Sequence, residues 1–327
     1  MTYRLTRNDR FLGAAIMYRG WGYAGYRPGD SMVALGGRSL GIKGKPGAAA
    51  VLQEMARNLT KLSAFDMSEP ALDSYIACIN RVRPAFVRGY PGALQVLAQR
   101  VLDKKVTVWS PRAVFTTSES LLPQMRASIQ EAFGCRVFDG YGLNDGGVSA
   151  YECEVHDGFH VDTERSILQV VDDHGDPVRK GIGRIVATTL TNYAMPLLRY
   201  DTGDMGETDE NAVCTCGRTR PLLKRILGRS TDVLVTPEGA KVHGWFFLYM
   251  FWDLGKGVRE YQVVQETVRD ITIRMVVGSE FDRTTIERVR DVIRNQSPEW
   301  VVRMELVDSI PRTIGGKVKF IESRVQC

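Results

Sequence analysis

Apolar and polar positions follow two different patterns along the 327-residue chain. In the first 150 residues, short apolar runs that predict strands are followed by segments with one apolar helical face. The strand-like runs are 31–37, 85–91 and 112–119, and the helical segments are 8–26, 47–59, 68–84 and 92–105. Strand and helix in alternation predict a parallel sheet with crossover helices.

The pattern changes after residue 150. Residues 160–192 contain short strand-like runs separated by "DHGDP" and "GIG", which are typical of turns, so this region predicts an antiparallel sheet or a small barrel. Beyond residue 229, a hairpin at 259–278, an amphipathic helix at 282–296 and a strand at 302–311 predict a compact α+β unit.

The predicted fold class is therefore α/β. A large N-terminal domain (1–228) holds a mixed or parallel sheet plus a β-rich subdomain, and a small α+β C-terminal domain (229–327) follows it.

Composition narrows the range of functions. Hydrophobic residues make up 44% and charged residues 25%, which is typical of a soluble protein. No apolar run approaches the roughly 20 residues that cross a bilayer, and the start "MTYRLTRNDR" does not resemble a signal peptide. We expect a cytoplasmic protein without a membrane partner. Its net charge of +5 comes from interspersed basic residues, which argues against nucleic-acid binding but suits anionic nucleotides.

Cysteine and histidine spacing indicates a metal site. Cys214 and Cys216 form a C-x-C pair, and "YECEVHDGFH" supplies Cys153 together with His156 and His160. Three thiolates and one imidazole would make a closed tetrahedral zinc site, with either histidine as the fourth ligand. The alternative is that Cys153 is a small buried apolar residue and the C-x-C pair is incidental.

Three charged residues suggest nucleotide chemistry when they are considered together. Asp204 lies in "TGD", a predicted tight turn, and Arg229 follows Gly228 at the predicted domain boundary. A carboxylate accepts hydrogen bonds from ribose hydroxyls, and a guanidinium binds hydroxyl or phosphate oxygens. Lys317 follows the glycines of "PRTIGGK" and could neutralise a carboxylate and a phosphate. Taken singly, each motif fits an ordinary turn with a solvated side chain better than a nucleotide site.

Their order is more specific than any one motif. The segments "TTSE" (116–119), "YGLND" (141–145), "YDTGD…GR" (200–229) and "PRTIGGK" (311–317) follow one another along the chain. This order resembles the adenylate-forming (AMP-binding) superfamily, and in particular its phenylacetate–coenzyme A ligase branch with the capsule-biosynthesis-type relatives. The resemblance extends from about residue 20 to residue 319.

The resemblance implies a role for each motif. Tyr141 would stack on adenine, with Gly140 and Gly142 giving the nucleotide room to approach the backbone. Asp204 would bind the ribose hydroxyls with help from Arg229. Asp145 would bind magnesium, and Lys317 would act in catalysis between the carboxylate and the α-phosphate. Tyr90, Ser118 and Glu119 would form an acyl pocket, and residues 228–232 would form a hinge. Zinc would be bound by Cys153, His160, Cys214 and Cys216, with His156 as the competing ligand.

The implied reaction joins a carboxylic acid to ATP, releases pyrophosphate and passes the acyl group to coenzyme A. It uses Mg²⁺, and relatives imply an aromatic or small organic acid and a homodimer. Two alternatives stay open. One keeps the adenylation but serves capsule polysaccharide or deazaflavin metabolism. The other is a catalytically impaired paralogue that binds a nucleotide or a protein partner.

Three departures from the family pattern qualify the implied activity. The family's phosphate loop, of the type "SSGTTG", does not occur, and the Gly-rich stretch 34–47 follows the helix that the loop should precede. Relative to the family, the chain is short at its N-terminus. Three explanations stay open: a fragment, a degenerate paralogue, or one half of a split enzyme whose upstream chain supplies the loop. Asp145 replaces a longer glutamate, and Thr231 stands at a usually acidic hinge position, next to Asp232.

Overall fold

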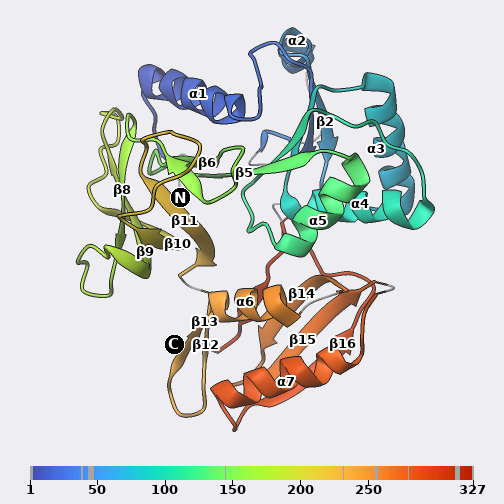
Figure 1. The fold of residues 1–327 in the computed structure, drawn as a ribbon, viewed down its shortest axis with the longest axis vertical. Coiled ribbons are helices and arrows are strands. Elements are labelled where there is room, and N and C mark those ends of the chain that lie inside the picture. Colours follow the sequence, from blue (N-terminus) through green and yellow to red (C-terminus); the bar gives the residue numbers. More distant parts are fainter. Residues whose placement is uncertain are drawn as a thin grey trace.

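The computed structural model describes residues 3–37, 40–42, 48–143, 145–230, 232–254, 257–278, 280–313 and 317–325. In this part of the chain, one sheet has eleven strands in the order β2-β1-β3-β4-β5-β6-β7-β11-β10-β9-β8 (Figure 1). Its first five strands are parallel, as the alternating pattern predicted. They are β1 (Met32–Gly36), β2 (Leu59–Ser63), β3 (Phe86–Gly89), β4 (Ala113–Thr117) and β5 (Arg136–Gly142).

Helices cover both faces of this parallel half. The described helices are α1 (Arg7–Gly22), α2 (Ala48–Ala56), α3 (Glu69–Val82), α4 (Pro91–Lys104) and α5 (Pro123–Phe133). Alternate strand residues point to opposite faces. Val87 and its equivalents on the neighbouring strands pack with α3, α4 and α5, whereas Phe86, Phe115 and Phe138 pack with Trp21 of α1. The sheet therefore lies between two helical layers.

The predicted β-rich region continues the same sheet. Antiparallel pairing of β5 with β6 joins the two halves, so this region is neither a separate sheet nor a barrel within the described strands. The remaining strands are β6 (Ser149–Glu152), β7 (Phe159–Val161), β8 (Ser166–Val171), β9 (Lys180–Thr189), β10 (Tyr200–Asp209) and β11 (Leu222–Arg229).

One predicted turn in this region is wrong. The "GIG" segment lies inside β9. Position 183 needs a glycine because a Cβ there would come within 2.3 Å of the Val171 carbonyl oxygen. This glycine therefore permits two strands to pack closely and does not reverse the chain.

The C-terminal part forms an α+β unit below the large sheet (Figure 1). A two-stranded hairpin is followed by a helix and by a sheet in the order β16-β15-β14-β17, with a second helix packed on it. The bounds are β12 (Val233–Val235), β13 (Lys241–His243), α6 (Gly244–Leu254), β14 (Val258–Gln265), β15 (Asp270–Val277), α7 (Thr284–Gln296), β16 (Val301–Leu306) and β17 (Ile321–Ser323).

The hydrophobic core of this unit also reaches the larger part. Phe251 and Tyr261 stack with ring centroids 4.0 Å apart, and Leu122, Met125 and Leu227 from the larger part belong to the same cluster. The division into two domains at residue 228 remains a proposal. No helix of the described chain is both long enough and apolar enough to cross a membrane.

Candidate active site

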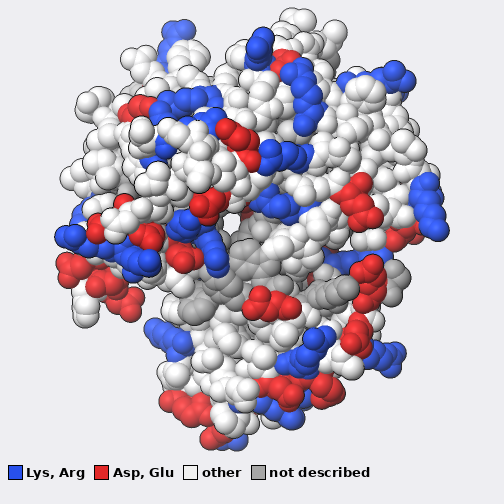
Figure 2. Space-filling view, in the orientation of Figure 1, with Lys and Arg blue, Asp and Glu red and all other residues white. Residues whose placement is uncertain are grey.

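A cleft of about 1510 Å³ lies between the large sheet and the C-terminal unit. It follows the carboxyl ends of β4 and β5, where open α/β sheets usually bind their ligands. Figure 2 shows the face of the molecule that is also seen in Figure 1, with a hollow near its middle that is bordered by basic and acidic side chains. The cleft is lined by Ser118, Glu119, Tyr141, Asp145, Asp204, Arg229 and Lys317 among others. The fold therefore brings together motifs that lie up to 199 positions apart in the sequence.

Asp204 is at the centre of the most compact cluster. The Tyr141 hydroxyl donates to Asp204 Oδ2 over 2.9 Å, and Arg229 Nε lies 3.2 Å from Asp204 Oδ1. Burial raises the pKa of Asp204, and Arg229 only partly opposes this rise. A buried carboxylate with one oxygen beside a phenol and the other beside a guanidinium is a rigid acceptor for hydroxyl groups.

The local structure around Asp204 differs from the predicted turn. Asp204 lies inside β10, opposite Arg229 of β11, at a break in the β9–β10 register between Asp201 and Asp204. Such bulges redirect side chains and are frequent beside functional sites. The glycine of "TGD", Gly203, has φ 73° at this bulge, so it permits the bulge and does not form a turn between strands.

Tyr141 and its flanking glycines lie at the end of β5, so the first half of "DGYGLNDGG" is strand. A Cβ at Gly140 would lie 3.0 Å from the Tyr151 ring, which gives this glycine a packing role. Asp145 accepts a hydrogen bond from the Tyr200 hydroxyl over 2.8 Å. Tyr200 was not predicted as a site residue. Asn144 lies outside the described residues, and magnesium binding at Asp145 stays a prediction.

Lys317 enters the cleft from the C-terminal unit. Its Nζ lies 5.7 Å from the centroid of the Tyr90 ring, and burial lowers the pKa of the ammonium group while Glu119 and Asp204 oppose that change. The three residues before Lys317 lie outside the described chain, as does Thr231 of the predicted hinge.

Glu119 links the cleft wall to the C-terminal unit. Its carboxylate accepts from the amide of Gly92 at the start of α4 (2.9 Å) and from the amide of Val318 (3.0 Å), and burial raises the pKa of this carboxyl. Ser118, with φ 73°, also lines the cleft. Tyr90 is fully buried in the core beneath α4, so its place in an acyl pocket stays a prediction.

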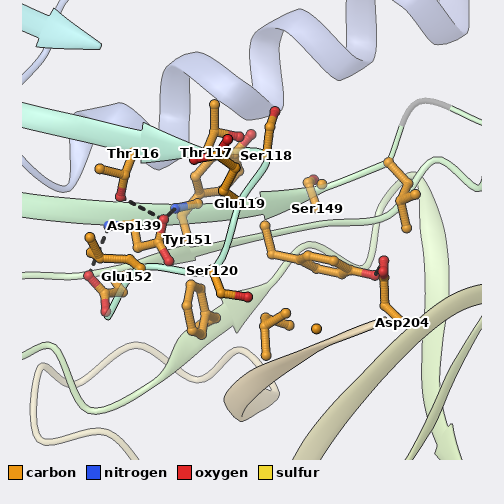
Figure 3. Close-up of a pocket in the computed structure, with 18 of the residues that line it drawn as sticks. Thr116, Thr117, Ser118, Glu119, Ser120, Asp139, Ser149, Tyr151, Glu152 and Asp204 are labelled. Carbon is orange, nitrogen blue, oxygen red and sulfur yellow. Dashed lines mark hydrogen bonds between the residues drawn. The ribbon is translucent and has the colours of Figure 1, made fainter. Parts of the chain in front are cut away.

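A buried acid pair in the cleft wall escaped the sequence analysis. Asp139 accepts from the Thr116 hydroxyl (2.6 Å), and its amide donates to Glu152 (2.9 Å). Glu152 is also bonded to Arg126 at 2.7 Å and to His156 at 3.1 Å. Burial and the charge of Glu152 raise the pKa of Asp139 to about 6. Figure 3 shows the two acids together, apart from Asp204.

The predicted zinc ligands also converge, away from the acid pair. The ligand atoms of Cys153, His160, Cys214 and Cys216 all lie within 4.8 Å of one another. Cys153 Sγ and Cys214 Sγ are 3.6 Å apart, and Cys216 Sγ is 3.3 Å from His160 Nε2. Two thiolates on one tetrahedral zinc ion would be about 3.8 Å apart, so the cluster fits the metal. His156 instead contacts Glu152, which favours His160 as the fourth ligand.

Electrostatics favour the metal-binding form at two of the four residues, whereas burial raises the pKa of the Cys153 thiol to about 12. Burial alone would raise the pKa of the Cys216 thiol, but hydrogen bonds from Arg218 outweigh burial and lower the pKa to about 7. Burial and the charge of Arg218 lower the pKa of His160, which keeps the imidazole neutral. Thiolate and neutral imidazole are the forms that bind metal ions.

The chain is similar in sequence to phenylacetate-coenzyme A ligases and to Protein CapK. A family model described as the CapK C-terminal domain matches residues 234–324. Protein CapK of Staphylococcus aureus is 25% identical over 273 residues, covering 82% of this chain and 59% of CapK. Phenylacetate-coenzyme A ligase of Thermus thermophilus is 29% identical over 290 residues, covering 85% of this chain and 63% of the ligase. The chain thus spans about three fifths of these curated relatives.

Solved structures of ligases share the fold. A 2-hydroxyisobutyryl-CoA ligase in the postadenylation state has a TM-score of 0.74 at 20% identity, covering 98% of this chain and 71% of that one. A benzoate CoA ligase from Burkholderia xenovorans has a TM-score of 0.66 at 16% identity, covering 96% of this chain and 65% of that one. By sequence the chain is thus similar to CapK and to phenylacetate-coenzyme A ligases, and its fold is that of the solved acyl-CoA ligases, which supports the resemblance that the order of the motifs indicated.

Proposed function

We propose that this protein activates a carboxylic acid with ATP and transfers the resulting acyl group to coenzyme A. The observation that supports this most directly is the shared cleft, in which Asp204, Tyr141 and Arg229 form one cluster and Lys317 enters from the other side. Asp204 would accept the two ribose hydroxyls, and the Tyr141 ring would lie against the adenine base.

In the first step, a carboxylate oxygen of the acid attacks the α-phosphorus of ATP, and the bond to pyrophosphate breaks. The Lys317 ammonium would neutralise the carboxylate and the α-phosphate, whose charges otherwise repel each other. Mg²⁺ would supply further neutralisation of the phosphates, with Asp145 among its ligands. In the second step, the thiol of coenzyme A attacks the acyl carbon, and AMP leaves.

The second step would need the C-terminal unit (229–327) to move about a hinge at 228–232. Two of the contacts that join it to the larger part would break in such a motion. They are the Val318–Glu119 hydrogen bond and the Arg259–Asp103 ion pair, with nitrogen and oxygen 3.0 Å apart in each. We propose Ser118 and Glu119, backed by Tyr90, as the acyl end of the cleft.

Pyrophosphate exchange into ATP tests the first step alone. With a panel of aromatic and small organic acids, the protein should catalyse exchange, and Lys317→Ala should reduce it about 100-fold or more. Lys104→Ala is the matched control, because Lys104 pairs with Asp73 on the surface and lies outside the cleft. Protein that binds ATP yet shows no exchange with any acid would contradict the proposal.

A second candidate is a protein that binds the nucleotide without turnover. The 327 residues contain no "SSGTTG"-type loop, so ATP turnover has to be measured on this chain itself. Calorimetry showing AMP binding without ATP turnover would support it, whereas turnover by this chain alone would exclude it. Adding an upstream chain that carries the loop tests the split-enzyme prediction.

The acyl group could also pass to an acceptor other than coenzyme A. The CapK C-terminal domain matches residues 234–324, so we keep the alternative in which the adenylation serves capsule polysaccharide or deazaflavin metabolism. The mass of the product formed with and without coenzyme A distinguishes a thioester from another ester or amide. The predicted homodimer is tested by sedimentation of the purified chain.

We also propose that Cys153, His160, Cys214 and Cys216 hold a structural zinc ion. The cluster has four ligands and is mostly buried, so it leaves no open position for substrate. Cys153 directly follows β6, His160 lies in β7, and the other two cysteines lie in the connection between β10 and β11, so a bound ion would join these segments. Its role would therefore be stability and not turnover.

A further inference from the structure

Arg88 is a cationic side chain of the cleft whose role the proposed reaction leaves open. It lies on β3, two residues after Phe86, and therefore on the face of the sheet that α1 covers. Its guanidinium carbon is 4.7 Å from the centroid of the Trp21 ring, and both residues line the cleft. The Nε atom is buried and has no hydrogen-bond partner in the described part of the chain.

The acids of the cleft wall on β5 and β6 are already engaged. Asp139 is bonded to Thr116, and Glu152 is bonded to Arg126 and His156. Burial lowers the pKa of Arg88, and the charges that oppose this come from tyrosines, with no carboxylate among them. A guanidinium stays charged in a protein, so Arg88 is a cation without an anionic partner among the described residues.

Such an arrangement is unfavourable unless a ligand completes it. Buried charges in folded proteins are normally paired, because an uncompensated charge loses its hydration. Arg88 pairs in register with Ala34 on one side and Phe115 on the other, so its neighbours on the sheet are apolar. Trp21 and the Tyr151 ring add aromatic walls to the same region of the cleft.

We propose that Arg88 binds a second carboxylate of the acid substrate, so that the protein selects dicarboxylic acids with an apolar or aromatic body. This inference rests on the proposed function. The planar guanidinium matches a carboxylate in two parallel hydrogen bonds, and the surrounding rings contact the apolar body. The first carboxylate would then be the one beside Lys317.

Matched pairs of acids test the assignment by binding. The pairs are phenylacetate with 1,4-phenylenediacetate, benzoate with terephthalate, and hexanoate with adipate. Calorimetric titration of the full chain should show at least one diacid bound about tenfold or more tightly than its partner, the range expected for a charge-assisted hydrogen bond. Arg88→Met should abolish this preference, and Arg88→Lys should retain only part of it.

Arg112→Met is the control variant. Arg112 also lies over an aromatic ring, that of Phe86 at 5.1 Å, but it pairs with Asp30 and does not line the cleft. It should leave the diacid preference unchanged. The melting temperature of Arg88→Met without ligand should equal or exceed that of the original chain, because the variant removes a half-buried cation that has no acidic partner among the described residues.

Three outcomes would overturn the assignment. They are equal binding of every diacid and its partner, a preference that survives in Arg88→Met, and a loss of AMP affinity in Arg88→Met with acid discrimination intact. The proposed function fails separately. If diacids bind in a way that depends on Arg88 but no pyrophosphate exchange occurs, the proposed acid activation is refuted and this inference stands. If exchange occurs but depends neither on the second carboxylate nor on Arg88, only this inference is refuted.

Discussion

Replacing Arg165 by methionine should destabilise the protein strongly, because it leaves the carboxylate of Asp9 buried without its cation. Arg165 Nε and Nη2 donate to the two oxygens of Asp9 over 3.0 and 2.6 Å, and the Thr191 hydroxyl donates to the same carboxylate over 2.7 Å. The side chains of Arg165 and Asp9 are only 7% and 1% exposed. This pair fastens α1, which forms a wall of the cleft, to the antiparallel half of the sheet.

The expected magnitude follows from this burial. Breaking a buried pair by removing one partner costs about 3–5 kcal/mol, whereas an exposed pair contributes at most about 1 kcal/mol. Replacing both partners with apolar residues, as in Asp9→Leu with Arg165→Met, should recover most of the loss, because no buried charge remains. The control is Arg179→Met, whose side chain is 81% exposed and pairs with Glu210.

The dependence on pH has a definite sign. Burial alone would raise the pKa of Asp9, but the hydrogen bonds and charge of Arg165, with Thr191, reverse this and lower it. In the original chain the pair thus stabilises the fold above the ordinary aspartate pKa, and this stability is lost as the pH falls. In Arg165→Met only the Thr191 hydrogen bond still opposes burial, so the pKa of Asp9 should rise and the loss of stability should be smaller at pH 4 than at pH 7.

Urea denaturation followed by tryptophan fluorescence measures these effects at both pH values. The reasoning is refuted if Arg165→Met costs no more than Arg179→Met at pH 7. It is equally refuted if the double variant is no more stable than Arg165→Met alone, because the unpaired carboxylate would then not be the cause.

Three further predictions concern the cleft and the metal cluster. Lys317→Ala should lose pyrophosphate exchange about 100-fold or more while AMP affinity, measured by calorimetry, changes little. Asp139 has a folded pKa raised to about 6, so its contribution to stability is present at low pH and lost as the pH rises through 6. Asp139→Asn should therefore stabilise the protein by about 2 kcal/mol more at pH 8 than at pH 4 in thermal melts, and equal effects at both pH values would contradict the cause given. Elemental analysis should find one zinc ion per chain, and Cys214→Ala should lower the melting temperature; zinc-free protein with an unchanged melting temperature would exclude the metal.

Local sequence patterns predicted the elements whose environment is repetitive. The apolar positions of α4, among them Leu94, Leu97 and Val101, recur at helical spacing because one face of the helix packs on the sheet. The hairpin of β14 and β15 was recognised for the same reason, since its strands are long and apolar. The order of Tyr141, Asp204, Arg229 and Lys317 identified the candidate nucleotide cluster.

Glycine-rich segments were less predictable. Gly140 and Gly183 lie inside strands, where a Cβ would meet the Tyr151 ring or the Val171 carbonyl oxygen. Glycine is required both where a chain turns and where two backbones or a ring approach closely. Sequence composition alone does not distinguish these two causes, because the second depends on residues that are remote in the chain.

The sequence by itself determined the fold class, the parallel order of the first strands and the residue types available for nucleotide and metal binding, because these depend on local periodicity and on motif order. Only the tertiary structure decided which of those residues meet. It directed His156 to Glu152 and His160 to the cysteines, and it joined the two halves of the sheet through β5 and β6. It also placed Arg88 in the cleft without an acidic partner among the described residues. These outcomes depend on contacts between distant segments, whose geometry is set by packing and burial.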